Sequence, residues 1–120
     1  MRAYGNSKLY NILFTKYLAE QLKDSGATVN CLHPGVVKTK IGNKNTGTLI
    51  KIFWNTYTAI RGISEEEGAQ TTLYLATSNE VENITGKYFD KCKEKTSSEI
   101  SNNFETAEKL WLMSKEMTRI

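Results

Sequence analysis

The chain has 120 residues and a formal net charge of +3, and its 39% hydrophobic and 24% charged residues are typical of one globular domain. The positive charge is small and scattered, so it gives no support for a nucleic-acid partner. No apolar run approaches the roughly 18 residues that a membrane-spanning helix needs, and no apolar segment of a signal peptide follows Met1.

The first predicted elements are a helix over residues 4–24 and a strand over residues 28–33. The helix carries apolar residues at spacings of three to five, and Gly26 suits the left-handed position that follows a helix. The strand is closed by Pro34 and Gly35, which cannot continue a ladder. A strand that follows a helix through a tight glycine turn favours an α/β architecture with a parallel sheet.

The rest of the chain predicts two more helices, a further strand and one aromatic segment. Residues 36–48 are polar and irregular, and residues 49–60 have helical apolar spacing. Ser64 and Glu67 have the spacing of a capping box, so a helix is expected over residues 65–77. A short strand is expected over residues 87–90. Asn103 can cap a final helix, one side of which carries Phe104, Ala107, Leu110, Trp111 and Met117.

Two short strands cannot form a stable parallel sheet, because such sheets need several strands and a cover on both faces. The helices also have wider apolar faces than these strands can bury. The pattern therefore predicts one incomplete α/β unit over residues 1–120. Cys31 is expected to be a small buried residue and His33, the only histidine, a structural one. Neither Cys31 nor Cys92 has metal-like spacing.

Tyr4 and Lys8 are the main candidates for chemistry. They are four residues apart at the start of a helix, so their side chains share one face. A free tyrosine has a pKa near 10, and a nearby ammonium favours the tyrosinate and lowers that pKa. Such a pair can exchange a proton with a carbonyl or alcohol oxygen. Many helices contain Y-x-x-x-K by chance, and the alternative is an interfacial tyrosine beside a solvated lysine.

The order of the motifs after this pair resembles the short-chain dehydrogenase/reductase family, and most closely its retinol dehydrogenase-like members. The resemblance begins with A-Y-G-N-S-K-L at residues 3–9 and N-I-L-F-T at residues 11–15, and L-H-P-G-V-V follows at residues 32–37. It continues with E-G-A-Q-T at residues 67–71, G-K-Y-F-D at residues 86–90 and L-W at residues 110–111. It thus covers nearly the whole chain in the family's order.

The resemblance implies the C-terminal half of a Rossmann-type doubly wound parallel sheet, with the N-terminal half absent. It implies that Tyr4 is the general acid/base and that Lys8 lowers its pKa and binds the nicotinamide ribose. The implied contacts with a cofactor, NADP(H) more than NAD(H), are Tyr4, Lys8, Pro34, Gly35, Val37 and Thr39. The family's glycine-rich phosphate turn and catalytic serine lie upstream of the tyrosine, and no G-x-x-x-G-x-G occurs in this chain. We therefore expect the isolated chain to be inactive.

The aromatic residues Phe53, Trp54 and Tyr57 suit a pocket for a lipophilic alcohol or aldehyde such as a retinoid. Core or dimer contacts are the alternative for these aromatics. The resemblance leaves contact with a membrane surface and homo-oligomerisation open. It also leaves the localisation open: the full-length protein would be intracellular, either in the cytoplasm or at the endoplasmic reticulum membrane. A metal is not expected.

Two other functional hypotheses remain. One is a non-catalytic fragment or truncated isoform that binds a partner. The other is a sugar-nucleotide epimerase or dehydratase, which shares Y-x-x-x-K, but the compact P-G-x-x-x-T turn at residues 34–39 disfavours it.

Overall fold

Helix α1 (Arg2–Gln21) is the longest element in the computed structural model, which describes residues 2–37 and 62–119. The helix was predicted to reach residue 24, but it ends at Gln21. Beyond Leu22 the backbone hydrogen bonds span three residues instead of four, as in a turn. In this turn the Ser25 hydroxyl donates to the Leu22 carbonyl at 2.7 Å. Gly26 follows with a φ of +76°, which confirms the left-handed position expected of this glycine.

Helix α4 (Phe104–Thr118) packs across α1 and forms the main hydrophobic core. Leu13, Tyr17 and Ala107 are buried at the contact. The Trp111 ring lies 5.4 Å from that of Tyr17, measured between centroids. The prediction that Met117 belongs to the packed side of α4 is wrong, because this residue is 82% exposed. The buried contacts lie before the last turns of the helix, so Met117 is beyond the crossing with α1.

The sheet has three short strands in the order β1 (Cys31–His33), β2 (Tyr88–Asp90) and β3 (Lys93–Lys95). Strands β1 and β2 are parallel, with Leu32 opposite Phe89, whereas β2 and β3 are antiparallel. The sequence predicted the two parallel strands, although with longer bounds. The third strand was missed because Lys-Glu-Lys has no apolar alternation. It is a charged edge strand, and the sheet is therefore mixed rather than parallel.

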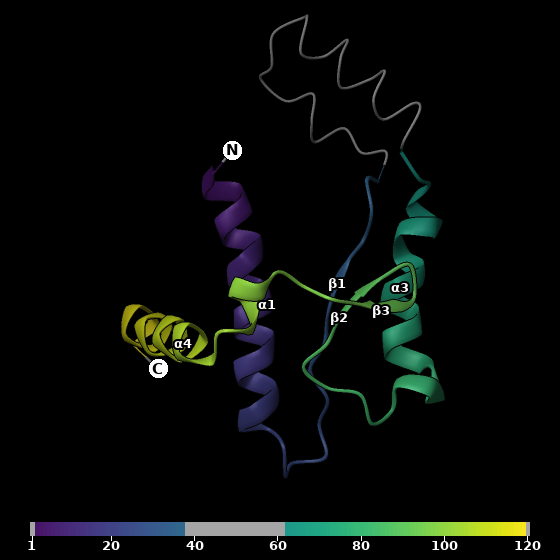
Figure 1. Cartoon of the computed structure of the whole chain (residues 1–120). Helices are drawn as coiled ribbons and strands as arrows, with labels where there is room; N and C mark the ends of the chain where they lie inside the picture. Colours follow the sequence, from purple (N-terminus) through teal and green to yellow (C-terminus); the bar gives the residue numbers. More distant parts are fainter. Residues whose placement is uncertain (1, 38–61, 120) are drawn as a thin grey trace, which may run out of the picture.

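Helix α3 (Glu65–Thr77) covers the sheet on the side away from α1, so the strands lie between the two helices (Figure 1). Its predicted capping box is confirmed: the Glu67 amide donates to the Ser64 hydroxyl at 3.1 Å, and the Ser64 amide donates to the Glu67 carboxylate at 3.4 Å. The Tyr74 ring packs at 6.3 Å from the buried Phe89 ring. Short 3₁₀ helices η2 (Asn79–Val81) and η3 (Glu99–Asn102) complete the described elements.

These elements confirm the α/β fold class and bring three chain segments to one end of the structure. Figure 1 shows the N-terminal end of α1, the carboxyl end of β1 and the N-terminal end of α3 at that end. The predicted helical segment at residues 49–60 lies outside the described residues. Within the described ranges, every helix is too short or too polar to cross a lipid bilayer.

Candidate active site

Tyr4 and Lys8 lie one turn apart near the start of α1, and the structure brings their side chains together. The Lys8 ammonium lies over the Tyr4 ring, 5.2 Å from the ring centroid, which is a cation–π geometry. Tyr4 is 70% exposed, so its phenol can reach a ligand at this end of the structure. The backbone carbonyl of Tyr4 accepts a hydrogen bond from Ser7 at 2.7 Å. The pair is thus preassembled on a rigid helix and open to solvent.

The turn after β1 is held in place by Ile63, which lies just before α3. Gly35 has a φ of +81°, a conformation that side-chain-bearing residues rarely adopt. A Cβ atom on Gly35 would lie 2.7 Å from the Ile63 Cδ1 atom. The Ile63 amide donates to the Val36 carbonyl at 2.9 Å, and Val37 forms a parallel bridge with Ile63. The positive φ favours glycine at this position, and the close approach of Ile63 adds a second reason that the sequence alone did not provide.

Helix α3 also contacts this turn directly through Gly68. A Cβ atom on Gly68 would lie 2.6 Å from Val37 Cγ2 and 3.5 Å from the Pro34 carbonyl oxygen. Gly68 is buried, and so is Thr71 one turn later. Sequence reasoning missed this contact, although a glycine inside a helix is a signal of close packing. The turn at residues 34–37 is thus fixed from one side by α3.

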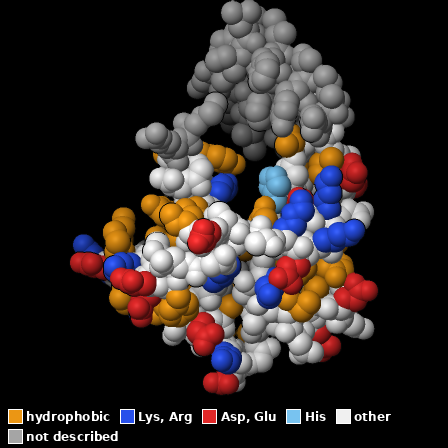
Figure 2. Space-filling model, viewed as in Figure 1, with side chains coloured by type: hydrophobic (Ala, Val, Ile, Leu, Met, Phe, Trp, Pro, Cys, Tyr) orange, Lys and Arg blue, Asp and Glu red, His pale blue; other side chains and the backbone are white. Residues whose placement is uncertain are grey.

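A cavity of about 500 Å³ opens beside the turn, between the carboxyl end of β1, α3 and the connection from β2 to β3. Figure 2 shows the His33 side chain at the surface on this side of the structure. Its lining comprises His33, Pro34, Gly35, Val36, Ile63, Glu67, Gln70, Thr71, Asp90, Lys91 and Cys92. Pro34 and Gly35, which were predicted to contact the cofactor, are among these lining residues. His33 was expected to be structural, but it is exposed and lines the cavity.

The charged groups around the cavity are partly neutralised by ion pairs. The Lys95 ammonium lies 2.5 Å from the Asp90 carboxylate, which is only 15% exposed. The hydrogen bond from Lys95 lowers the pKa of Asp90, and the same contact raises the pKa of Lys95. Lys87, just before β2, pairs with Glu94 of β3 at 2.8 Å. Within the described ranges, no three His, Cys, Asp or Glu residues are grouped as metal ligands.

The remaining predicted residues are placed as follows. Cys31 is half-buried rather than fully buried, and this burial raises the pKa of its thiol. Thr39 and the aromatic set Phe53, Trp54 and Tyr57 lie outside the described residues. The described part therefore brings the Tyr4–Lys8 pair and the turn at residues 34–37 to one end of the fold. Open α/β sheets bind ligands at this carboxyl end of the strands, so the arrangement fits a bound cofactor.

Comparisons with known proteins identify the family of the chain. A family model described as enoyl-(acyl carrier protein) reductase matches residues 1–90. Retinol dehydrogenase 14 from Homo sapiens is 43% identical over 115 residues, which are 95% of this chain and 34% of that protein. Retinol dehydrogenase 12 from Mus musculus is 40% identical over 118 residues, or 98% of this chain and 36% of that protein. The chain thus spans about a third of the length of these relatives. It belongs to the short-chain dehydrogenase/reductase family and is similar to its retinol dehydrogenases.

Proposed function

We propose that this chain carries the catalytic pair of an oxidoreductase that interconverts an alcohol and a carbonyl compound with a nicotinamide cofactor. The observation that carries the proposal is the exposed Tyr4 phenol with the Lys8 ammonium against its ring, 5.2 Å from the centroid. The pair lies at the same end of the fold as the turn after β1 (Figure 1). Membership of the short-chain dehydrogenase/reductase family supports the assignment.

In this proposal Tyr4 moves the proton. Its phenol donates a proton to the carbonyl oxygen of the substrate during reduction and takes it back from the alcohol during oxidation. Lys8 balances the negative charge that the phenol then carries, and its ammonium can also donate to a ribose hydroxyl. The nicotinamide, when bound, supplies or accepts the hydride. NADP(H) is the cofactor that we favour over NAD(H).

The turn at residues 34–37 would position the cofactor. Its backbone is fixed by the Ile63 amide and by the close approach of Gly68, so it can present polar atoms without reorganising. Pro34 and Gly35 would lie beside the nicotinamide, and Val37 and Thr39 would hold its carboxamide and pyrophosphate ends. A preorganised turn lowers the entropic cost of ordering a bound cofactor.

We further propose a lipophilic substrate of the retinoid kind, because the relatives are named retinol dehydrogenases. Phe53, Trp54 and Tyr57 would contribute apolar surface to its pocket. The protein would act inside the cell, in the cytoplasm or at the endoplasmic reticulum membrane. Contact with the membrane surface would suit a lipophilic substrate. Homo-oligomerisation is a separate part of the proposal. The 120-residue chain alone should show negligible turnover, since it contains no G-x-x-x-G-x-G turn for the dinucleotide.

The test uses the natural protein that carries this chain and measures NADPH-dependent reduction of retinaldehyde. Tyr4→Phe should lower kcat by about 10²–10⁴-fold, the usual contribution of general acid catalysis, while NADPH still binds. Tyr10→Phe is the matched control, because Tyr10 is also an exposed tyrosine of α1, at 46%. It should keep full activity.

Three outcomes would contradict the proposal. An active Tyr4→Phe enzyme would remove Tyr4 from the mechanism, and an equal loss in Tyr10→Phe would indicate damage to the helix instead. Absence of turnover in the unmodified protein, with NADPH and a set of lipophilic aldehydes and ketones, would favour the non-catalytic, partner-binding alternative.

A further inference from the structure

The connection between β2 and β3 is a strained turn at the edge of the cavity. Asp90 and Lys93 are opposite each other in the antiparallel ladder, so only Lys91 and Cys92 connect the strands. Both have positive φ values, 53° and 59°. Such a two-residue turn normally uses asparagine, aspartate or glycine, because other side chains are disfavoured in this conformation. The surrounding structure must therefore hold the turn in place.

A buried hydroxyl supplies that support. The Cys92 amide donates to the Thr71 hydroxyl at 3.2 Å, and Thr71 is only 4% exposed. The turn is thus attached to the inner face of α3, and Lys91 and Cys92 both line the cavity. The strained backbone has a consequence for the site: it holds an exposed lysine at the opening of the cavity.

The polar groups of the cavity differ in whether they already have partners. The two carboxylates of the lining already have partners. Asp90 forms an ion pair with Lys95, and Glu67 accepts a hydrogen bond from the Ser64 amide in the capping box. Within residues 2–37 and 62–119, no side-chain hydrogen bond or ion pair is formed by His33, Gln70 or Lys91. All three can donate hydrogen bonds. Three side chains of the lining are therefore available to donate hydrogen bonds, although Gln70 and a neutral His33 can also accept them.

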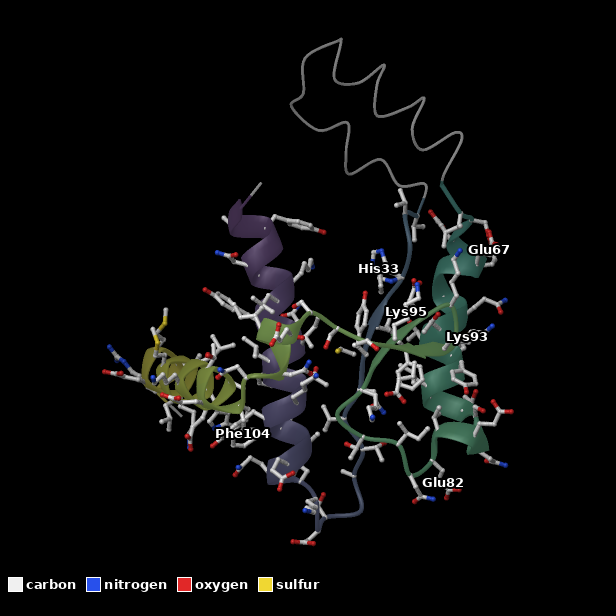
Figure 3. All side chains as sticks on the ribbon, in the orientation of Figure 1. His33, Glu67, Glu82, Lys93, Lys95 and Phe104 are labelled. Atoms are coloured by element: carbon white, nitrogen blue, oxygen red, sulfur yellow. The ribbon has the colours of Figure 1, made fainter. Side chains whose placement is uncertain are left out.

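The charge next to the cavity adds to this effect. Lys93 and Lys95 lie on β3, which β2 separates from the strand of His33, and lysine side chains gather on this part of the surface (Figures 2 and 3). Figure 3 also places Glu67 and His33 at the same end of the structure, on α3 and β1. Lys95 offsets the charge of Asp90, so Lys91 and Lys93 together exceed the single remaining carboxylate of the cavity, Glu67, and leave a small net positive charge at this edge.

We propose that this cavity is a binding site for a small oxyanion, a phosphate or carboxylate group, held by His33, Gln70 and Lys91. Lys91 supplies the charge-assisted hydrogen bond, and the imidazole and the carboxamide orient the oxygens. The oxyanion ligands do not include Tyr4 or Lys8, but the cavity shares Pro34 and Gly35 with the turn proposed to position the cofactor. Oxyanion binding can be measured without turnover, so failure of this inference is distinguishable from failure of the proposed oxidoreductase activity.

His33 gives a direct measurement, because it lines the cavity and is the only histidine of these 120 residues. Its imidazole Cε1–H signal, identified in the natural protein as the signal that a His33→Gln variant lacks, can be followed by NMR at fixed pH and constant ionic strength while sodium phosphate, acetate or chloride is added. We expect a saturable shift with phosphate or acetate and none with chloride. Tighter binding of phosphate would identify a phosphate site, and tighter binding of acetate a carboxylate site.

Two variants separate binding from folding. Lys91→Gly removes the ammonium and suits the positive φ of this position, so the turn should persist. It should weaken oxyanion binding by about tenfold or more, the effect of losing one charge-assisted hydrogen bond. Lys93→Gln is the matched control. It removes the same charge at a position two residues from Lys91, and the Lys93 side chain does not line the cavity. It should weaken binding by no more than about twofold, as expected of a screened surface charge.

The amide signal of Cys92 reports whether the turn is intact, and Lys91→Asn provides a second variant that tolerates this conformation. A shift that does not saturate, or that chloride reproduces, would overturn the proposal. Equal weakening by Lys91→Gly and Lys93→Gln would also overturn it, because the effect would then be diffuse surface charge. Unchanged affinity in both Lys91 variants with an intact turn would remove Lys91 from the site.

Discussion

Replacing Gly68 by alanine tests whether helix α3 fixes the turn after β1. A Cβ atom at this position would lie 2.6 Å from Val37 Cγ2, closer than real Cβ atoms approach a neighbour. Val37 cannot move freely, because it is bridged to Ile63. Overpacking of this kind usually costs about 1–3 kcal/mol of stability. The substitution also gains about 0.5–1 kcal/mol, because alanine forms helices better than glycine.

Gly5→Ala is a matched control for the helix-forming gain. Gly5 and Gly68 are each the fourth residue of their helix, α1 and α3, and a Cβ atom on Gly5 has no neighbour within 4 Å. We expect Gly5→Ala to stabilise the protein by about 0.5–1 kcal/mol. Gly68→Ala should be less stable than Gly5→Ala by about 1–3 kcal/mol, because the helix-forming gain cancels in this comparison.

The assay is urea unfolding of each variant, followed by far-UV circular dichroism. Adding Val37→Ala to Gly68→Ala removes the Cγ2 atom, so the double variant should show a favourable coupling of about 1 kcal/mol or more in a double-mutant cycle. If Gly68→Ala stabilises the protein as much as Gly5→Ala does, or if the cycle shows no coupling, the close contact between α3 and Val37 does not exist.

Two further predictions concern the cap of α3 and the Asp90–Lys95 pair. Ser64→Ala removes the hydroxyl that accepts a hydrogen bond from the Glu67 amide. It should destabilise the protein by about 1 kcal/mol in the same urea assay, whereas Ser64→Asp should keep most of the stability. Because Lys95 lowers the pKa of Asp90, the carboxylate stabilises the fold at pH values above the ordinary pKa of aspartate, and this contribution is lost as the pH falls through the lowered value. Lys95→Met should raise the Asp90 pKa, measured by carboxyl ¹³C NMR, and an unchanged titration midpoint would show that the ion pair is absent in solution.

Local sequence signals predicted the elements that depend on neighbouring residues. The capping box at Ser64 and Glu67 set the start of α3, and Gly26 marked the turn between α1 and β1, because caps and left-handed glycines act over one turn of chain. The Tyr4–Lys8 pair was predictable for the same reason, since residues four apart on a helix share a face.

Other features have no local signal. Strand β3 consists of three charged residues, and it becomes a strand only because the β2 edge offers partners for its main-chain groups. Met117 fits the apolar side of α4 in the sequence, but only the crossing with α1 determines where that side stops being buried.

The cavity shows the same division between local pattern and tertiary contact. Motif order in the sequence indicated the family, the general position of the turn after β1 and the Tyr4–Lys8 pair that we propose for proton transfer. The tertiary structure placed His33, Gln70 and Lys91 around one hollow, since they come from a strand, a helix and a hairpin turn that are far apart in the chain. It also explained Gly35 and Gly68, whose missing side chains make room for Ile63 and Val37. Sequence patterns determine elements through neighbouring residues, whereas a site formed between elements depends on long-range packing, which no short pattern encodes.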